Sequence, residues 1–456
     1  MAYRSTNPFT NTVEQTFEEL SDEQLQAKLQ TAQSCFENNW RDQSFAQRKT
    51  VLKKAAALMR ERQQHLAALA TREMGKLIAQ SAGEVALSAA IIDYYADHAE
   101  AFLAPEPLKT DKGQAVVESS PVGVLFGVEP WNFPYYQIAR FAAPNLMAGN
   151  VVMVKHASNV PQCALAFEQL MHDAGLPVGG YTNLFVSKDQ VGALIDDKRV
   201  RGVALTGSEE AGAVVATRAG KNLKKSTMEL GGSDAFIVLE DADMARTVKH
   251  AVSGRMGNAG QACTASKRFI VLDAVADVFL EQFKAAMAEF KPGDPMDERS
   301  TLAPLSSADA LDKLEKQVQT AVQHGAKLVL GGERVAGMKG NFMQPTILTD
   351  IAEDNPMFSQ EFFGPVALFF RVPDEAAAIA VANNSPFGLG GSVFTQDAER
   401  GRRVARRIDT GMVFINSAAV SMPDLPFGGV KNSGYGRELS AAGIQEFVNK
   451  KLIRVA

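Results

Sequence analysis

The sequence predicts an α/β protein built on two successive parallel β-sheets. From Val122 onward, short apolar stretches alternate with helical patterns, as in chains whose parallel strands are joined by helices. A first series of these stretches ends before residue 231, and a second series begins near Asp234. The chain has 456 residues, more than one hydrophobic core usually holds, so two or three folding units are expected.

The segments before the first sheet predict helices and then one isolated strand. From Asp22 to about Leu103, apolar residues recur at three- and four-residue spacing, which is typical of amphipathic helices. From Lys109 to Ser120, apolar and polar residues alternate instead. This alternation predicts a strand outside the main core that is suited to a contact between subunits.

Nine apolar stretches define the two sheets. The first sheet is expected to hold VGVLFGV, NVVMVK, YTNLFV and VRGVALTG, and the second AFIVL, RFIVL, KLVL, VALFFRV and GMVFIN. Helical patterns such as Ala308 to His324 separate them. The sequence contains no internal repeat and no long Gly/Ser linker, so the two blocks are expected to pack tightly together.

The composition excludes several classes of function. The formal net charge is -5, which gives no basic footprint for nucleic acid or for an anionic membrane. The chain has no run of eighteen apolar residues and no apolar leader of the secretory type, so we expect a cytoplasmic protein with no membrane partner. Its cysteines are too few and too far apart for a disulfide framework or a metal cluster, and no metal is expected.

One of the three cysteines has the surroundings of a nucleophile. Cys263 lies in the loop NAGQACT, whose small residues leave room for a substrate and bring backbone N–H groups near the sulfur. A lone cysteine is more often a small buried hydrophobic residue. Cys35 and Cys163 lie in helical patterns and fit that structural role.

The ends of the first strands carry further candidate residues. Pro130 and Pro134 bracket the segment PWNFP, which would hold the Asn132 amide rigidly or would simply form a turn with core aromatics. Lys155 leaves the next strand at the edge where nucleotides bind in such sheets, although it could equally be a surface lysine. The turn LTGS, ending at Ser208, could present backbone N–H groups to a diphosphate.

Two more segments contain candidate acidic residues. Glu229 opens the segment ELGG at the junction of the two blocks, where it could be a general base or a salt-bridged structural acid. Glu361 opens EFFGP, and the segment PFGGVK begins at Pro426. The glycines and prolines of these last two segments also have structural explanations.

Together, in this order and at these separations, the motifs resemble those of the aldehyde dehydrogenase superfamily, and they are most similar to its succinate-semialdehyde dehydrogenase branch. The resemblance runs from about residue 20 to the C-terminus. It implies a Rossmann-type cofactor-binding domain, an α/β catalytic domain and a small β oligomerisation element of a homodimer or homotetramer. These parts would comprise residues 1–107 with 122–231, residues 232–435, and residues 108–121 with 436–456.

The resemblance also implies a role for each motif. Cys263 would be the nucleophile, Asn132 the oxyanion donor and Glu229 the base that activates water, so that an aldehyde is oxidised through a thioester. The cofactor, NAD or NADP, would be held by Trp131, Lys155, Ser158, Thr206, Gly207, Ser208, Leu230, Gly231, Glu361 and Phe363. Ser158 stands where many NAD-preferring relatives have a glutamate, so we expect NADP to be accepted as well as NAD.

The substrate prediction rests on Arg140, eight residues after Asn132. On a helix that begins near Phe133 or Tyr135, its guanidinium could face the aldehyde tunnel and hold the distal carboxylate of succinate semialdehyde. Succinate-semialdehyde dehydrogenases are similar at this position, and Ser421 would add a hydrogen bond. The alternative is an arginine on the helix surface.

One departure from the branch weakens the substrate prediction, and other functions stay open. The second arginine of the branch, expected six residues before the nucleophile, is Gly257 here, and Arg255 is out of register. The enzyme could therefore prefer glutarate semialdehyde or aliphatic aldehydes. A CoA-acylating enzyme would generally lack Glu229, and a catalytically silent relative would lack a member of the predicted catalytic set, which is intact.

Overall fold

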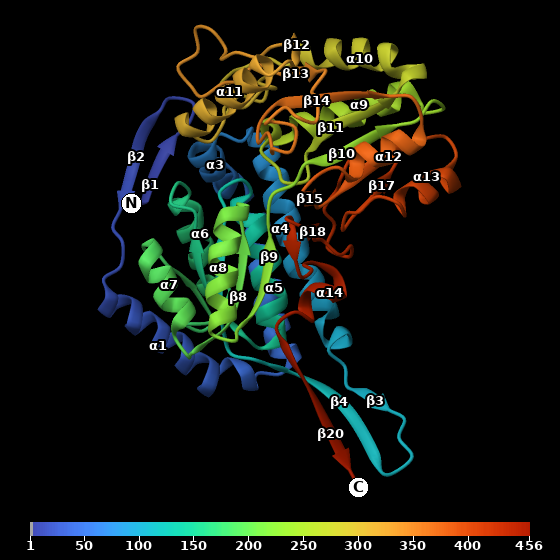
Figure 1. The fold of residues 1–456 in the computed structure, drawn as a ribbon. Coiled ribbons are helices and arrows are strands. Elements are labelled where there is room, and N and C mark those ends of the chain that lie inside the picture. The colour runs from blue at the N-terminus through green and yellow to red at the C-terminus, as the bar shows by residue number, and fades with distance from the viewer. Residues whose placement is uncertain (1–2) are drawn as a thin grey trace.

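A computed structural model describes residues 3–456. It shows two α/β units packed against each other and a three-stranded arm that projects from the first unit, with the C-terminus at its tip (Figure 1). Within the described residues, no helix is both long enough and apolar enough to cross a lipid bilayer.

The N-terminal region forms a hairpin and then the predicted helices. The strands β1 (Tyr3–Asn7) and β2 (Thr12–Phe17) pair antiparallel, a hairpin that the sequence did not predict. Four α-helices and one short 3-10 helix follow: α1 (Asp22–Asn38), η1 (Trp40–Asp42), α2 (Phe45–Glu61), α3 (Gln63–Met74) and α4 (Ile78–Phe102). Helix α1 begins at the predicted residue because the hydroxyl of Ser21 accepts a hydrogen bond from the Gln24 backbone amide.

The first sheet has the strand order β19-β9-β8-β5-β6-β7. Its strands are β5 (Val124–Glu129), β6 (Val151–His156), β7 (Tyr181–Asn183), β8 (Val200–Thr206), β9 (Lys225–Glu229) and β19 (Gly434–Tyr435). Strands β5 to β9 are parallel, and the chain reverses its direction of travel across the sheet after β7. The carboxyl ends of β5 and β8 therefore flank a switch point, where α/β sheets bind ligands.

Helices cover this sheet on both faces. They are α5 (Pro134–Ala148), α6 (Pro161–Asp173), α7 (Lys188–Asp196) and α8 (Glu209–Lys221). Helix α5 begins where the sequence predicted, directly after the Asn132 segment, and its first residue is a proline, which needs no hydrogen-bond acceptor there.

The second sheet has the order β12-β13-β14-β11-β10-β16-β17, and only β12 runs antiparallel to its neighbour. Its strands are β10 (Asp234–Val238), β11 (Ser266–Leu272), β12 (Lys327–Leu330), β13 (Thr346–Thr349), β14 (Val366–Val372), β16 (Gly391–Phe394) and β17 (Phe414–Ile415). The remaining elements are α9 (Met244–Met256), η2 (Gly257–Gly260), α10 (Asp273–Ala288), α11 (Ala308–Gln323), α12 (Glu375–Asn383), β15 (Phe387–Gly388), α13 (Ala398–Ala405), β18 (Val430–Lys431) and α14 (Ser440–Ile444).

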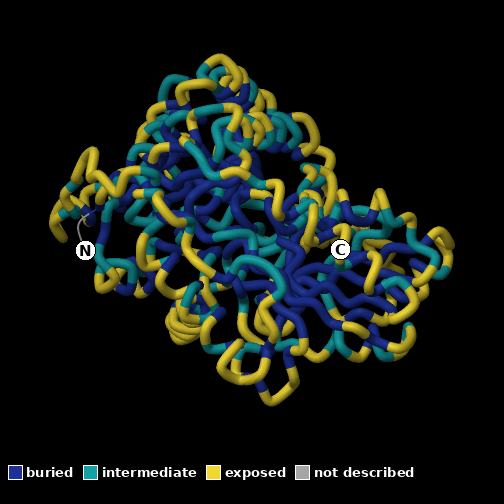
Figure 2. The backbone as a smooth tube through the Cα atoms, turned by 90° about the horizontal axis from the view of Figure 1, so that it is seen from above, coloured by how far each residue is buried: buried dark blue, intermediate teal, exposed yellow. Residues whose placement is uncertain are grey.

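Both faces of the second sheet are buried. In β10, Ala235 and Ile237 belong to one apolar cluster, whereas Phe236 and Val238 belong to another on the opposite face. This burial explains why the strand appears in the sequence as a continuous apolar run. Figure 2 shows the buried backbone concentrated inside the molecule and the exposed segments at its margins.

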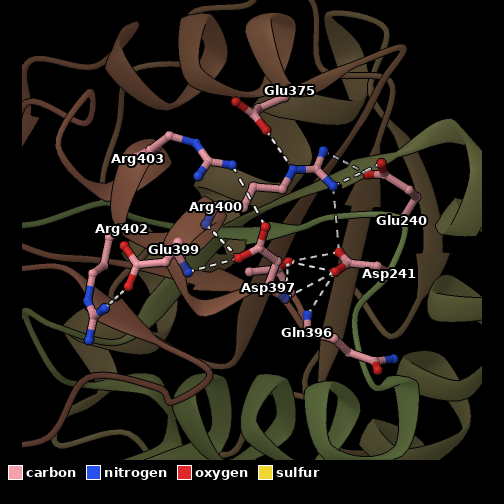
Figure 3. A network of polar contacts seen from close by, with 10 residues as sticks. Glu240, Asp241, Glu375, Gln396, Asp397, Glu399, Arg400, Arg402 and Arg403 are labelled. Atoms are coloured by element: carbon pink, nitrogen blue, oxygen red, sulfur yellow. Dashed lines mark hydrogen bonds and ion pairs between the residues drawn. The ribbon is translucent and has the colours of Figure 1, made fainter.

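A network of charged side chains ties together three elements at the edge of the second unit. Arg400 on α13 pairs with Glu240, at the end of β10, and with Glu375, at the start of α12 (Figure 3). Asp241 accepts hydrogen bonds from Thr395 and from the backbone amide of Gln396. Single exposed pairs contribute little, but a network that joins three elements fixes their relative positions.

The arm is built from segments that are far apart in the sequence. Strand β4 (Gln114–Pro121) pairs with β3 (Glu106–Leu108) and with the C-terminal strand β20 (Val448–Val455). The prediction of one strand from Lys109 to Ser120 is wrong in its first half. Residues 109–113 form the connection between β3 and β4, and Gly113 there has a φ of 76°, which favours glycine.

Candidate active site

A cavity of about 390 Å³ lies at the carboxyl ends of β5, β8 and β9, where the chain crosses from the first sheet to the second. Most of the residues predicted for catalysis or cofactor binding line this cavity. They are Trp131, Asn132, Thr206, Gly207, Ser208, Leu230, Gly231, Cys263, Glu361 and Phe363. Segments more than 200 residues apart in the sequence therefore meet at one site, as the motifs predicted.

The loop that carries Cys263 is held in an unusual backbone conformation. Asn258, Ala259 and Gly260 have φ angles of 53°, 50° and 75°, in the left-handed region. The buried Arg255 guanidinium donates to the carbonyl of Gly260 at 2.7 Å, and the Gln261 side chain donates to that of Asn258 at 3.1 Å. Arg255 therefore stabilises this loop, residues 257–263, which we call the Cys263 loop.

The junction glycines allow a close approach to this loop. A β-carbon at Gly232 would lie 2.5 Å from the carbonyl oxygen of Cys263, which is too close for any other residue. The crossing between the two sheets thus packs directly against the Cys263 loop.

The thiol of Cys263 is half-buried in the cavity wall. Desolvation raises its pKa to about 12, although the positive charges of Arg140 and Lys267 oppose this effect. The thiol is therefore neutral at pH 7 in this state. Attack on an aldehyde requires a base to remove its proton or a change in the charges around it.

Asn132 lies three residues after the end of β5 and contacts the Cys263 loop. Its Nδ2 donates to the carbonyl of Gln261 at 3.2 Å, and Asn258 Nδ2 donates to the Asn132 carbonyl at 3.0 Å. One N–H of the Asn132 amide is left for an oxygen in the cavity. Asn132 and Cys263 line the same cavity.

Two residues that the sequence analysis did not single out fix the start of α5 behind Asn132. The Glu84 carboxylate accepts from the backbone amides of Tyr135 and Tyr136, at 2.8 and 3.2 Å. His156 Nε2 lies 2.9 Å from the Pro134 carbonyl oxygen, and Nδ1 lies 2.9 Å from the Ala157 amide nitrogen and 3.2 Å from the Glu129 carbonyl oxygen, so the ring joins the end of β5 to the start of α5. Burial lowers the pKa of His156 to about 4, so its ring is neutral.

Glu229 lies behind the cavity at the end of β9, and its side chain is buried. Among the described residues, none donates a hydrogen bond to its carboxyl oxygens. Burial and the neighbouring Glu438 raise the pKa of Glu229 well above its usual range, and Arg140 and Arg437 oppose that rise. A carboxylate whose pKa is raised is a stronger base than an exposed one, as water activation requires.

Lys155 and Ser158 lie outside the cavity, at the end of β6 and just beyond it. The N-terminal hairpin covers them. Lys155 Nζ lies 5.7 Å from the centre of the Tyr3 ring, and the Arg4 amide donates to the Ser158 carbonyl at 2.9 Å. Strand β6 is the neighbour of β5, so both residues stand beside the cavity edge.

Arg140 is buried, so the alternative of an arginine on the helix surface is wrong. It forms an ion pair with Glu438 and donates to the hydroxyls of Tyr136 at 3.2 Å and of Thr206 at 3.3 Å. Tyr136 in turn donates to the Ser421 hydroxyl at 3.0 Å. Arg140 and Ser421 do not line the cavity, but Arg140 is one hydrogen bond behind Thr206, which does.

The sequence analysis also missed Lys267. This buried lysine lies in β11, and its Nζ contacts the carbonyl oxygens of Ala262 and Cys263 and the carboxylate of Glu361. The signal that could have found it is a lysine at the start of a largely apolar strand, four residues after Cys263.

The chain belongs to the aldehyde dehydrogenase family, whose model matches residues 1–453. It is 49% identical to the succinate-semialdehyde dehydrogenase [NADP(+)] of Deinococcus radiodurans, over 99% of this chain and 94% of that protein. It is 44% identical to the Escherichia coli succinate semialdehyde dehydrogenase [NAD(P)+] Sad, over 93% of this chain and 92% of that protein.

Among solved structures, the succinic semialdehyde dehydrogenase of Streptococcus pyogenes in complex with NADP+ is similar throughout. The TM-score is 0.98 and the identity is 49%, and the match covers 100% of both chains. The α/β fold with an aldehyde dehydrogenase arrangement, predicted from the motifs, is therefore confirmed.

Proposed function

We propose that this protein oxidises succinate semialdehyde to succinate, with Cys263 as nucleophile, Asn132 as oxyanion donor and Glu229 as the base for water. The observation that carries the substrate assignment is a buried guanidinium, Arg140, one hydrogen bond behind the cavity wall and joined through Tyr136 to Ser421. The names of the full-length relatives, which are succinate-semialdehyde dehydrogenases, support the same substrate.

The proposed chemistry uses each residue in turn. The Cys263 thiolate adds to the aldehyde carbon, because the carbonyl carbon cannot release hydride until it becomes tetrahedral. The Asn132 amide and the Cys263 backbone N–H stabilise the oxyanion, and one such donor is typically worth about 3 kcal/mol of barrier. When bound, NAD or NADP accepts the hydride. Glu229 then takes a proton from the water that attacks the thioester.

The cavity has the features that a dinucleotide requires. The turn from Thr206 to Ser208 leads into the N-terminus of α8, where free backbone N–H groups favour a diphosphate. The Glu361 carboxylate lines the same cavity and would accept hydrogen bonds from a ribose. Lys155, beside the cavity edge, would bind the same ribose, next to the nicotinamide.

Replacing Arg140 by alanine should lower kcat/KM for succinate semialdehyde by about one to two decades. The Arg140 side chain does not line the cavity, so we expect its charge to act on the substrate carboxylate through Thr206, and losing that effect should cost roughly 2 to 3 kcal/mol. Butanal has no carboxylate and should be affected far less. Steady-state kinetics with both aldehydes measures the ratio.

The ratio of kcat/KM for succinate semialdehyde to that for butanal separates substrate binding from general damage to the site. This separation is needed because Arg140 also pairs with the buried Glu438. Arg140→Ala leaves that carboxylate without its partner, so the melting temperature should fall as well. The variant Arg140→Lys keeps a charge beside Glu438 but loses the planar fork, and serves as the control. Equal losses for the two aldehydes would make Arg140 structural and would favour a general aliphatic aldehyde dehydrogenase.

We further propose that both cofactors are used, because Ser158 carries no charge that would repel a 2′-phosphate. The substitution Ser158→Glu should lower kcat/KM for NADP by about tenfold or more and leave that for NAD nearly unchanged, since like charges in contact are costly. The control Ser158→Gln adds similar bulk without charge. If Ser158→Glu affected NADP and NAD alike, Ser158 would not face the 2′ position.

The domain division proposed is residues 1–107 with 122–231 for the cofactor, 232–435 for catalysis, and 108–121 with 436–456 for assembly into a cytoplasmic homodimer or homotetramer. Support for the last part comes from the arm, where Ile453 and Val455, two residues apart and so on the same face of β20, are 39% and 64% exposed. Apolar side chains exposed together on a projecting sheet favour a protein contact. Light scattering should give a mass of two or four chains, and a monomer would contradict the proposal.

A further inference from the structure

The Cys263 loop, residues 257–263, is hydrogen-bonded to a buried ammonium group. The Lys267 side chain is 0% exposed, and its Nζ donates to the carbonyl oxygens of Ala262 and Cys263, both at 2.8 Å. It also pairs with Glu361 Oε1 at 3.0 Å. An ammonium has three N–H donors, so these three partners use all of them and hold the charge in one place.

The contact with Ala262 reaches the oxyanion site through one peptide group. The Ala262 carbonyl and the Cys263 N–H belong to the same peptide, so a cation bound to the carbonyl polarises the N–H at the other end. Hydrogen bonds linked in this way strengthen one another. The Cys263 N–H is therefore a better donor to an oxyanion than a peptide whose carbonyl has no such partner.

The same charge acts on the sulfur. Burial is the largest effect on the Cys263 thiol, and it raises the pKa. Lys267 lowers the pKa and so opposes burial, whereas Glu361 raises the pKa further. Lys267 and Glu361 are an ion pair, so the net field at the sulfur depends on both members. A lysine that served only to hold the loop could be replaced by a neutral donor, whereas one that supplies a field could not.

We propose that Lys267 is a positioning residue of the aldehyde dehydrogenase reaction. Its ammonium holds the Cys263 loop from behind and stabilises negative charge, first on the sulfur and then on the oxyanion, through the Ala262–Cys263 peptide. The inference rests on the proposed role of Cys263 as the nucleophile. Glu361 then has a second effect besides cofactor binding: its negative charge weakens the field of Lys267 at the sulfur.

The first test is alkylation of Cys263 by iodoacetamide at pH 8, followed by mass spectrometry of the Cys263 peptide. Removing a neighbouring charge should raise the pKa of the thiol by about one to two units. Because a more basic thiolate is also more nucleophilic, the alkylation rate should fall by only about three- to tenfold. We expect this fall in both Lys267→Met and Lys267→Gln, although glutamine can still donate to a carbonyl.

Two further variants fix the sign of the effect. Glu361→Gln removes the opposing charge and should increase the alkylation rate, by a similar factor. Lys316→Met removes an exposed lysine from α11 and should leave the rate unchanged. If Lys267→Met is too unstable to study, Lys267→Gln and Glu361→Gln still give opposite predicted shifts.

The second test is the rate of the first turnover with succinate semialdehyde and NADP, measured by stopped flow. In Lys267→Gln this rate should fall by a larger factor than alkylation does, because iodoacetamide forms no oxyanion. An equal fall would overturn the effect on the oxyanion. Unchanged alkylation in both Lys267 variants would overturn the effect on the sulfur.

These outcomes are distinct from failure of the proposed catalytic roles. If Cys263→Ala retained turnover, the assignment of the nucleophile would be wrong, whatever the alkylation rates. If Cys263→Ala were inactive and the Lys267 variants reacted like the wild-type protein, only the role of Lys267 would be lost.

Discussion

Replacing Cys263 by alanine should abolish aldehyde oxidation and leave cofactor binding close to that of the wild-type protein. The substitution removes the one thiol that lines the cavity but leaves the backbone N–H and the cofactor-binding residues in place. Without a nucleophile, no tetrahedral adduct forms and no hydride can leave. Reduced-cofactor formation measures the first effect, and calorimetric titration with NADP measures the second.

The other two cysteines provide matched controls. Cys35 and Cys163 are 6% and 0% exposed, so alanine at either position should lower the melting temperature through a small cavity and leave kcat nearly unchanged. Substantial turnover by Cys263→Ala would contradict the thioester mechanism. Loss of NADP binding in that variant would show that the substitution had disturbed the site.

The sequence predicted the strands that are apolar runs and missed those that are not. Strands such as β10 and β14 are buried on both faces, so their burial is visible in composition alone. Strand β9, with the sequence KSTME, begins with polar residues, and β2 is largely exposed. These two segments form strands because they pair with neighbouring strands in the folded chain, and their own hydrophobic pattern does not indicate it.

The candidate site divides in the same way. The positions of Asn132 and Cys263 at the cavity were predictable because each lies in a local motif whose glycines or prolines shape a loop. The contacts of Lys267 and Arg140 were not predictable. Helical spacing places Arg140 on a face of α5, but it does not reveal that every residue of α5 is buried or that the ion-pair partner, Glu438, lies 298 residues later.

Replacing Glu229 by glutamine should produce a rapid burst of reduced cofactor followed by a slow phase. The substitution keeps the shape of the side chain and removes the base, so the thioester should form but hydrolyse more slowly, by a factor of about 10² to 10⁴. Stopped-flow measurement with succinate semialdehyde and NADP gives the amplitude and both rates. A burst that matches the number of active sites would place the defect after hydride transfer.

The pH dependence adds a second measurement. The base must be ionised to accept a proton, so wild-type deacylation should fall as the pH drops through the pKa of Glu229. Burial and Glu438 raise this pKa, so the fall should lie at higher pH than for an exposed glutamate. In Glu229→Gln the deacylation rate should no longer fall in this pH range. Glu446 carries a neighbouring charge that raises the pKa of Glu229. The variant Glu446→Gln should therefore keep fast deacylation, and its rate should fall only at a lower pH.

A result with neither burst nor turnover in Glu229→Gln would change the order of proton transfers. Desolvation raises the pKa of the Cys263 thiol to about 12, so in the resting state the thiol keeps its proton at pH 7 and needs a base before it can attack. Loss of the burst would identify Glu229 as that base. In that case, alkylation of Cys263 by iodoacetamide should also slow in Glu229→Gln, whereas a base for water alone would leave the alkylation rate unchanged or raise it, because Glu229 raises the pKa of the thiol.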